Sequence, residues 1–268
     1  MPDLTTTSSI TPGSESVDEF YVGYLAMPAR HLRFARSFCA VAFAFCGALS
    51  LCLSKLHSHP GGGTWSSAEA KPFEGVIEAS PYPMIRMPTD DPARPFQTLL
   101  LVEVGKRGGG ARAAPFDGQL VRVSGWLLER DGRRMLEMEP RPDAIRRLAT
   151  LPVGGARLGP PPVAHLGGVT VRGEIIDAKC FLGAMRPGEG KTHKECATLC
   201  IRGGIPPMFV ARDAEGRTAY YLLTDRDGNA VGGEILPYVA DSVEIHGQVE
   251  RRGDLLLLQI NPTDIRRL

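Results

Sequence analysis

The sequence predicts a mainly β protein: two tandem small β-barrels after one N-terminal transmembrane helix, with a short helical insertion in the second barrel. Three observations lead to this prediction. The N-terminal part holds one long apolar run, a later stretch occurs twice, and each copy of that stretch alternates apolar and polar residues. The 268 residues also include 31 glycines and 22 prolines, an excess that favours short strands and turns over long helices.

The sequence argues against ligands that are bound through phosphate groups. With 31 basic and 30 acidic residues, the chain lacks the basic excess of proteins that bind a nucleic-acid backbone. The stretch GEGKT (188–192) is similar to part of a phosphate-binding loop, but Met185 stands where the motif G-x-x-x-x-G-K-[ST] requires glycine. We therefore expect neither a nucleic acid nor a nucleotide as a partner.

The apolar run predicts a transmembrane helix at residues 37–56. Residues 37–54 contain no charged side chain, and the run to residue 56 is just long enough to cross the hydrocarbon core of a bilayer. Its three cysteines fit as small apolar side chains of this helix: they are Cys39, Cys46 and Cys52. Arginines precede the run at positions 30, 33 and 36. The positive-inside rule then predicts a single-pass protein of the bacterial inner membrane, with its C-terminal domains in the periplasm.

The segments on either side of this helix are expected to be flexible. Residues 1–36 begin with a tail rich in Ser, Thr and Pro, which predicts a disordered cytoplasmic segment. Residues 57–71 are rich in glycine and serine and predict a linker. A cleaved signal peptide, with a cleavage site at Ala48-Leu49-Ser50, is the alternative to an uncleaved membrane anchor.

One stretch of the sequence occurs twice. Residues 121–140 align without gaps with residues 243–262, and both copies end in Ile-Arg-Arg-Leu. Upstream, residues 76–82 align with residues 175–181. Such repetition predicts a duplicated domain. The first domain, the Gly/Pro-rich linker and the second domain are expected at residues 72–150, 151–167 and 168–268, respectively.

Strand patterns in the second copy predict a small barrel. Val243, Ile245 and Gly247 alternate with polar residues before a turn and the run LLLLQI, which is the pattern of a hairpin with one buried face. Further elements are expected as strands at 169–177, 207–212 and 218–224 and as a short helix at 235–240. Five strands with a helix before the fourth resemble the OB-fold, a small Greek-key barrel. This likeness of architecture implies no particular function.

The second copy differs from the first by an insertion at residues 180–207, which holds three cysteines. Thr192, as N-cap, and Glu195, three residues later, form the pattern of a capping box. This pattern predicts a helix from residue 193 to about 201, which ends before Gly203-Gly204.

The insertion gathers side chains that bind metals. On the predicted helix, His193, Cys196 and Cys200 share one face because they are spaced by three and four residues. Cys180, at the end of the preceding strand, and Met185 are expected to approach that face. Three thiolates and one imidazole make a full tetrahedral set for zinc. Soft sulfur ligands equally suit Cu(I), an iron–sulfur centre or a haem iron.

Two other roles for these cysteines stay open. In an oxidising compartment, a disulfide between Cys180 and either Cys196 or Cys200 would fasten the inserted helix to the barrel. That pairing leaves one thiol over. A thiol near a helix N-terminus is a good candidate for redox chemistry, which is the third interpretation.

The stretch from Asp177 to Pro207 has the pattern D-x-K-C-x-x-G-x-M-x-P-G-x-G-K-T-H-K-x-C-A-x-x-C-I-x-G-G-I-P-P. It resembles a segment of uncharacterised membrane-anchored bacterial proteins with exported OB-fold-like domains and a Cys/His motif. The resemblance covers this stretch alone and implies no mechanism.

These patterns favour a membrane-anchored extracytoplasmic protein that binds a metal or a redox cofactor, in the role of an assembly or accessory factor for a membrane protein complex. The alternative is a non-catalytic interaction module whose cysteines form a structural disulfide. No arrangement of acid, base and nucleophile stands out besides the thiols, which argues against an enzyme.

Overall fold

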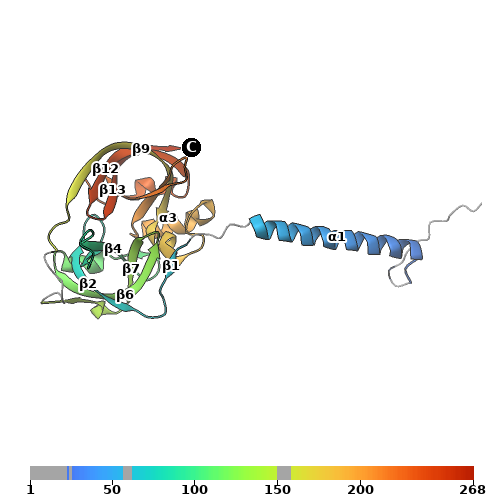
Figure 1. The fold of residues 1–268 in the computed structure, drawn as a ribbon, viewed down its shortest axis with the longest axis horizontal. Helices are drawn as coiled ribbons and strands as arrows, with labels where there is room; N and C mark the ends of the chain where they lie inside the picture. The colour runs from blue at the N-terminus through green and yellow to red at the C-terminus, as the bar shows by residue number, and fades with distance from the viewer. Residues whose placement is uncertain (1–22, 24–25, 57–61, 150–157) are drawn as a thin grey trace, which may run out of the picture. The chain divides into compact units, whose positions relative to one another are not determined.

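The computed structural model describes residues 23, 26–56, 62–149 and 158–268. These residues form a mixed α/β structure in two compact units, which we describe separately. One unit is the N-terminal part of the chain with its long helix, and the other runs from Pro60 to Leu268 and holds every strand of the described residues (Figure 1).

The long helix α1 spans Ala29–Leu56 and therefore begins before the expected start at residue 37. Residues 29–36 include three arginines and two alanines, which favour helix, and Pro28 directly precedes them. The arginines that we expected in a disordered tail therefore lie in the first turns of the helix. By length and composition, α1 is able to cross a membrane. The rest of the expected tail, residues 1–22 and 24–25, lies outside the described residues.

The second unit carries its own hydrophobic cores. Helix α1 contributes no buried residue. All three clusters of buried apolar side chains are formed by residues between Ile77 and Ile265. A fragment that begins at Pro60 thus retains every buried residue that the structure describes. We expect such a fragment to fold on its own.

The first β-sheet of this unit closes into a ring. Strands β2, β3, β4, β7 and β6 follow one another around it, and β6 pairs again with β2. All of these neighbours are antiparallel except β4 and β7, which are parallel. The elements of this sheet are β1 (Thr64–Trp65), β2 (Lys71–Glu78), β3 (Met84–Pro88), β4 (Phe96–Glu103), β5 (Arg107–Gly108), α2 (Gly110–Ala113), η1 (Ala114–Phe116), β6 (Leu120–Arg130), β7 (Arg133–Met138), η2 (Pro142–Ala144) and β8 (Ile145–Arg147).

The second sheet is a closed five-stranded barrel with the same order of strands. Strands β9, β10, β11, β13 and β12 follow one another around it, and β11 and β13 are its parallel pair. The short helical insertion lies between the first two of these strands. The elements are β9 (Val163–Asp177), η3 (Cys180–Ala184), η4 (Lys191–His193), α3 (Lys194–Arg202), β10 (Pro207–Arg212), β11 (Thr218–Asp225), η5 (Gly233–Tyr238), β12 (Ser242–Arg252) and β13 (Leu255–Arg267).

The repeated stretch has the same strand pairing in both sheets. Val121 pairs with Arg147 in the first sheet, and Val243 pairs with Arg267 in the second. Both arginines belong to the Ile-Arg-Arg-Leu sequence that ends each copy. The downstream alignment therefore marks equivalent positions in space.

The upstream alignment is wrong by one residue. The amide of Gly118 donates to the carbonyl of Ile77, and the amide of Ala240 donates to the carbonyl of Ile175, both at 2.9 Å. Ile77 therefore corresponds to Ile175, whereas the sequence alignment placed it over Ile176. Apolar character could not distinguish the two choices, because Ile175 and Ile176 are both buried.

Both expected linkers are shorter than the sequence indicated. Thr64–Trp65, inside the expected linker 57–71, forms β1 and pairs with β6. Strand β9 starts at Val163, inside the expected linker 151–167, because its first residues continue the pairing with β12. Residues 57–61 and 150–157 lie outside the described part of the chain.

The two sheets share one hydrophobic cluster, besides a core of their own in each. Tyr82 shows how closely the two are joined. Its hydroxyl donates to the carbonyl of Leu223 at 2.8 Å and accepts from the amide of Val231 at 3.1 Å. Burial raises the pKa of Tyr82. A side chain of the first sheet therefore satisfies buried backbone groups of the second.

Candidate functional site

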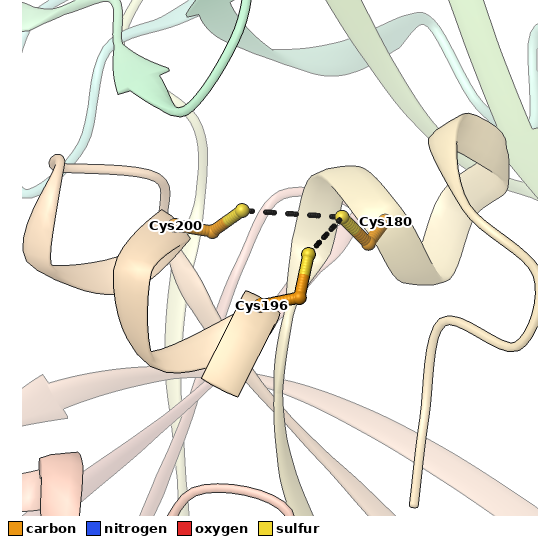
Figure 2. Close-up of side chains that lie close together, drawn as sticks. All are labelled: Cys180, Cys196 and Cys200. Atoms are coloured by element: carbon orange, nitrogen blue, oxygen red, sulfur yellow. Dashed lines mark hydrogen bonds between the residues drawn. The ribbon is translucent and has the colours of Figure 1, made fainter. Parts of the chain in front are cut away.

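Three cysteines from two segments of the insertion lie close together. Cys180 opens the π-helical turn η3, while Cys196 and Cys200 are one turn apart on α3. The Sγ atom of Cys180 is 3.9 Å from each of the other two sulfurs, and all three lie within 4.8 Å of one another (Figure 2). These distances are far above the approximately 2.05 Å of a disulfide. All three side chains are free thiols.

The carboxylate of Asp177 holds Cys180 and His193 in place. Asp177 is fully buried at the end of β9. Its Oδ1 accepts from the amide of Cys180 at 2.8 Å, and its Oδ2 accepts from Nε2 of His193 at 3.1 Å. The sequence reasoning did not select Asp177. An aspartate three residues before a helical turn is a known signal of side-chain-to-backbone bonding and could have identified it.

The structure divides the predicted Cys3His ligand set into two groups. Cys180, Cys196 and Cys200 form one group, and Asp177, Cys180 and His193 form the other. His193 is buried and belongs to the 3-10 turn η4 that precedes α3. Its imidazole is therefore engaged with the carboxylate rather than aligned with the two thiols on the helix.

Met185 does not join the site, and the predicted capping box does not form. Met185 is 48% exposed and belongs to neither group. The chain enters α3 through η4, so the N-cap position of α3 is His193 and no side chain caps the helix there. Thr192 is therefore not the N-cap, and Glu195 lies within the first turn. The predicted end of the helix is confirmed, because Gly203 follows its last residue.

Lys106, from the loop between β4 and β5 of the first sheet, reaches the sulfur atoms. Its Nζ donates to Sγ of Cys196 at 2.7 Å and to Sγ of Cys200 at 3.5 Å. The hydrogen bond to Cys196 is the main cause that raises the pKa of Lys106. Sequence reasoning missed this residue, because nothing in the first copy marks a loop that meets the second.

The thiols of Cys180 and Cys200 have opposite tendencies to ionise. The hydrogen bond between Cys180 and Cys200 is the largest cause for both: it raises the pKa of Cys180 and lowers the pKa of Cys200. Burial raises the pKa of Cys180 further, and Lys106 helps to lower that of Cys200. The site thus favours a thiolate at Cys200 that is stabilised by a neighbouring thiol and an ammonium group.

Lys179, the residue before the first cysteine of the site, holds the loop that presents Lys106. Its Nζ donates to the carbonyls of Glu103 and Gly105 at 2.8 and 2.7 Å, and lies 3.2 Å from Oε1 of Glu137. Lys179 and Glu137 are both buried. The same lysine therefore connects the start of η3 to the first sheet and fixes the residue next to Lys106.

The end of α3 also rests on that loop. The amide of Gly108 donates to the carbonyl of Gly203 at 2.8 Å. A Cβ atom on Gly203 would lie 1.8 Å from the carbonyl oxygen of Lys106, and one on Gly108 would lie 2.0 Å from that of Gly204. These glycines are needed for the close approach of two backbones.

No protein-family model matches the chain, and no curated protein or solved structure matches it.

Proposed function

We propose that this chain is a membrane-anchored extracytoplasmic protein that binds one thiophilic metal ion through Cys180, Cys196 and Cys200. The observation that carries the proposal is the spacing of the sulfurs. With metal–sulfur bonds of about 2.3 Å, two thiolates on one ion lie about 3.8 Å apart in a tetrahedral and about 4.0 Å apart in a trigonal arrangement. The two distances of 3.9 Å from Cys180 fall between these values.

The ligand set favours Cu(I). Thiolates select Cu(I), Zn²⁺ or iron–sulfur clusters. A cluster with four cysteine ligands would need one more than the three cysteines that follow α1 in the sequence. Zn²⁺ prefers four ligands, but His193 does not belong to the group formed by the three thiols. Cu(I) accepts three soft ligands, and Lys106 offsets part of their negative charge.

Two β units make up the part of the chain after Pro60: the first is the ring of β2, β3, β4, β7 and β6, and the second is the barrel of β9, β10, β11, β13 and β12. We further infer that both β units are OB-folds. The strand order around each ring is first, second, third, fifth, fourth, with the third and fifth strands parallel. The 3-10 helix η5 precedes β12, which is the fourth strand of the second β unit. This order and the short helix support the expected Greek-key barrel.

The same proposal places the β units in the bacterial periplasm. Helix α1 has the length and apolar character of a membrane span, and its arginines lie near its N-terminal end, which supports a cytoplasmic N-terminus. A cleaved signal peptide would give the same compartment for the β units. A thiolate metal site held near the membrane suits an assembly or accessory factor for a membrane protein complex.

Metal analysis of the fragment 60–268 tests the proposal. The fragment is exported to the periplasm of a bacterial host and purified without chelator, and it lacks the three cysteines of α1. We expect about one copper per chain in the wild-type fragment, and loss of the metal in Cys196→Ser and in Cys200→Ser. Met185→Leu is the matched control, because Met185 lies outside the group of three thiols, and it should keep the metal.

The free thiols of the same samples are titrated after unfolding. A fragment without metal that holds a single free thiol would contradict the proposal. It would instead support the alternative, an interaction module whose insertion is fastened by a disulfide from Cys180 to Cys196 or Cys200.

Lys106→Met is expected to weaken the affinity for Cu(I) by about 10- to 100-fold, the usual effect of losing a group that supports metal ligands. The number of ions bound should stay the same, because all three sulfurs remain. Competition against a coloured Cu(I) chelator measures the affinity. Lys71→Met, at an exposed position on β2, is the control and should bind like wild type. Equal affinities for both variants would show that Lys106 does not act on the site.

A further inference from the structure

A cavity of about 620 Å³ lies between the two β units. This volume is within the range of about 300–1,000 Å³ that is usual for small-molecule sites. None of the three clustered cysteines is among its lining residues, so it is distinct from the proposed metal site. Apolar side chains of the shared cluster form much of its wall: Leu100, Leu182, Met208, Tyr220, Leu222 and Leu255.

Among the described residues, one of the arginines that line the cavity forms no ion pair. The lining arginines Arg94 and Arg134 are paired with acidic residues, at 3.1 Å with Asp91 and at 2.8 Å with Glu129. Arg133 forms no ion pair within 4.0 Å among the residues that the structure describes. Its guanidinium lies 5.2 Å from the ring centroid of Tyr220.

The acidic groups that line the cavity are already engaged. Asp254 accepts from the amide of Thr98 at 2.8 Å and from its hydroxyl at 2.6 Å, and Asp91 pairs with Arg94. Asp131, which precedes the lining residue Gly132, accepts from the hydroxyl of Tyr220 at 2.5 Å. The cavity thus offers apolar side chains together with the half-buried Arg133, which has no carboxylate partner among the described residues.

We propose that this cavity binds a small organic anion with an apolar body, of the class of medium-chain carboxylates. The hydrocarbon chain would occupy the apolar interior, and the carboxylate would pair with Arg133, whose planar guanidinium suits this geometry. Apolar walls are poor partners for ordered water, which favours an apolar occupant. The inference does not depend on the metal site.

Calorimetric titration of the fragment 60–268 with sodium dodecanoate, below the concentration at which it forms micelles, tests the proposal. We expect one ligand per chain. Arg133→Gln should weaken binding of dodecanoate by about tenfold or more, because a hydrogen bond to a charged group is lost, and Arg133→Lys should restore part of it. The neutral 1-dodecanol should bind more weakly than dodecanoate to wild type, and equally to wild type and Arg133→Gln.

Two further variants test the location. Leu255→Trp fills the cavity from its wall and should reduce binding of both ligands, while circular dichroism verifies that the fragment is folded. Arg251→Gln removes an exposed arginine that does not line the cavity and should bind dodecanoate like wild type. The proposal is overturned if dodecanoate does not bind to the folded wild type, or if Arg133→Gln and Leu255→Trp both bind it unchanged.

Discussion

Replacing Lys179 with methionine is expected to lower the free energy of unfolding by about 3–5 kcal/mol, the usual cost of removing one partner of a buried ion pair. The side chains of Lys179 and Glu137 are 6% and 3% exposed. Without the lysine, the carboxylate of Glu137 would stay buried without a cation, and its Oε2 already has no hydrogen-bond partner among the described residues. Two backbone carbonyls, of Glu103 and Gly105, would lose their donor as well.

Urea unfolding of the metal-free fragment 60–268 measures this loss. The double variant Lys179→Met with Glu137→Leu should recover a large part of the stability, because apolar replacement of a whole buried pair is often close to neutral. Lys194→Met is the matched control: this pair is only partly buried, and its partner Asp241 keeps Arg267 as a second cation, so we expect a loss of about 0–1 kcal/mol. A Lys179→Met variant as stable as wild type would show that this ion pair does not hold the two β units together.

Gly203→Ala is expected to cost about 3 kcal/mol of stability, at the upper end of the usual cost of overpacking. It should also lower the affinity for Cu(I). The φ angle of Gly203 is −79°, which alanine adopts without strain, so the effect comes from the new methyl group alone. That group would lie 1.8 Å from the carbonyl oxygen of Lys106. The end of α3 and the loop must therefore separate, which carries Lys106 away from the sulfur of Cys196.

Gly110→Ala serves as the control for this substitution. Gly110 lies in the short helix α2, and a Cβ atom there meets nothing within 4 Å, so the change should be neutral or slightly stabilising. Unfolding in urea and competition for Cu(I) are measured on both variants. Wild-type values for Gly203→Ala would mean that the backbone can move apart at little cost.

Local patterns in the sequence were enough to predict much of the β structure. The strand β10 matches the expected range 207–212, and β11 extends the range 218–224 by one residue. Alternation of apolar and polar residues reports directly which face of a strand is buried: His246 is exposed in β12, whereas its neighbours Ile245 and Gly247 are buried. The three clustered cysteines were found because thiols are rare enough to stand out in one short segment.

The remaining parts of the site could not be predicted, because they depend on packing between distant segments. Lys106 lies in the short loop between β4 and β5, and its sequence neighbourhood gives no sign that it meets α3. His193 has the right spacing for a helix face, but the buried carboxylate of Asp177 attracts its imidazole and the chain forms a 3-10 turn there. The shared hydrophobic cluster likewise requires knowledge of which strand faces turn toward each other.

The ammonium group at the thiol cluster is that of Lys106, which belongs to the first copy of the repeat, and this copy contains no cysteine. Each copy therefore supplies a part that the other lacks, so neither copy holds the whole arrangement by itself. Recombination that transferred only the cysteine-bearing half into another gene would leave behind Lys106, the glycine against which the end of α3 packs (Gly108), and the first copy's part of the shared hydrophobic cluster. We therefore expect the thiol cluster and Lys106 to be inherited only where both copies are present. Substitutions in the loop that carries Lys106 should be constrained by residues of α3.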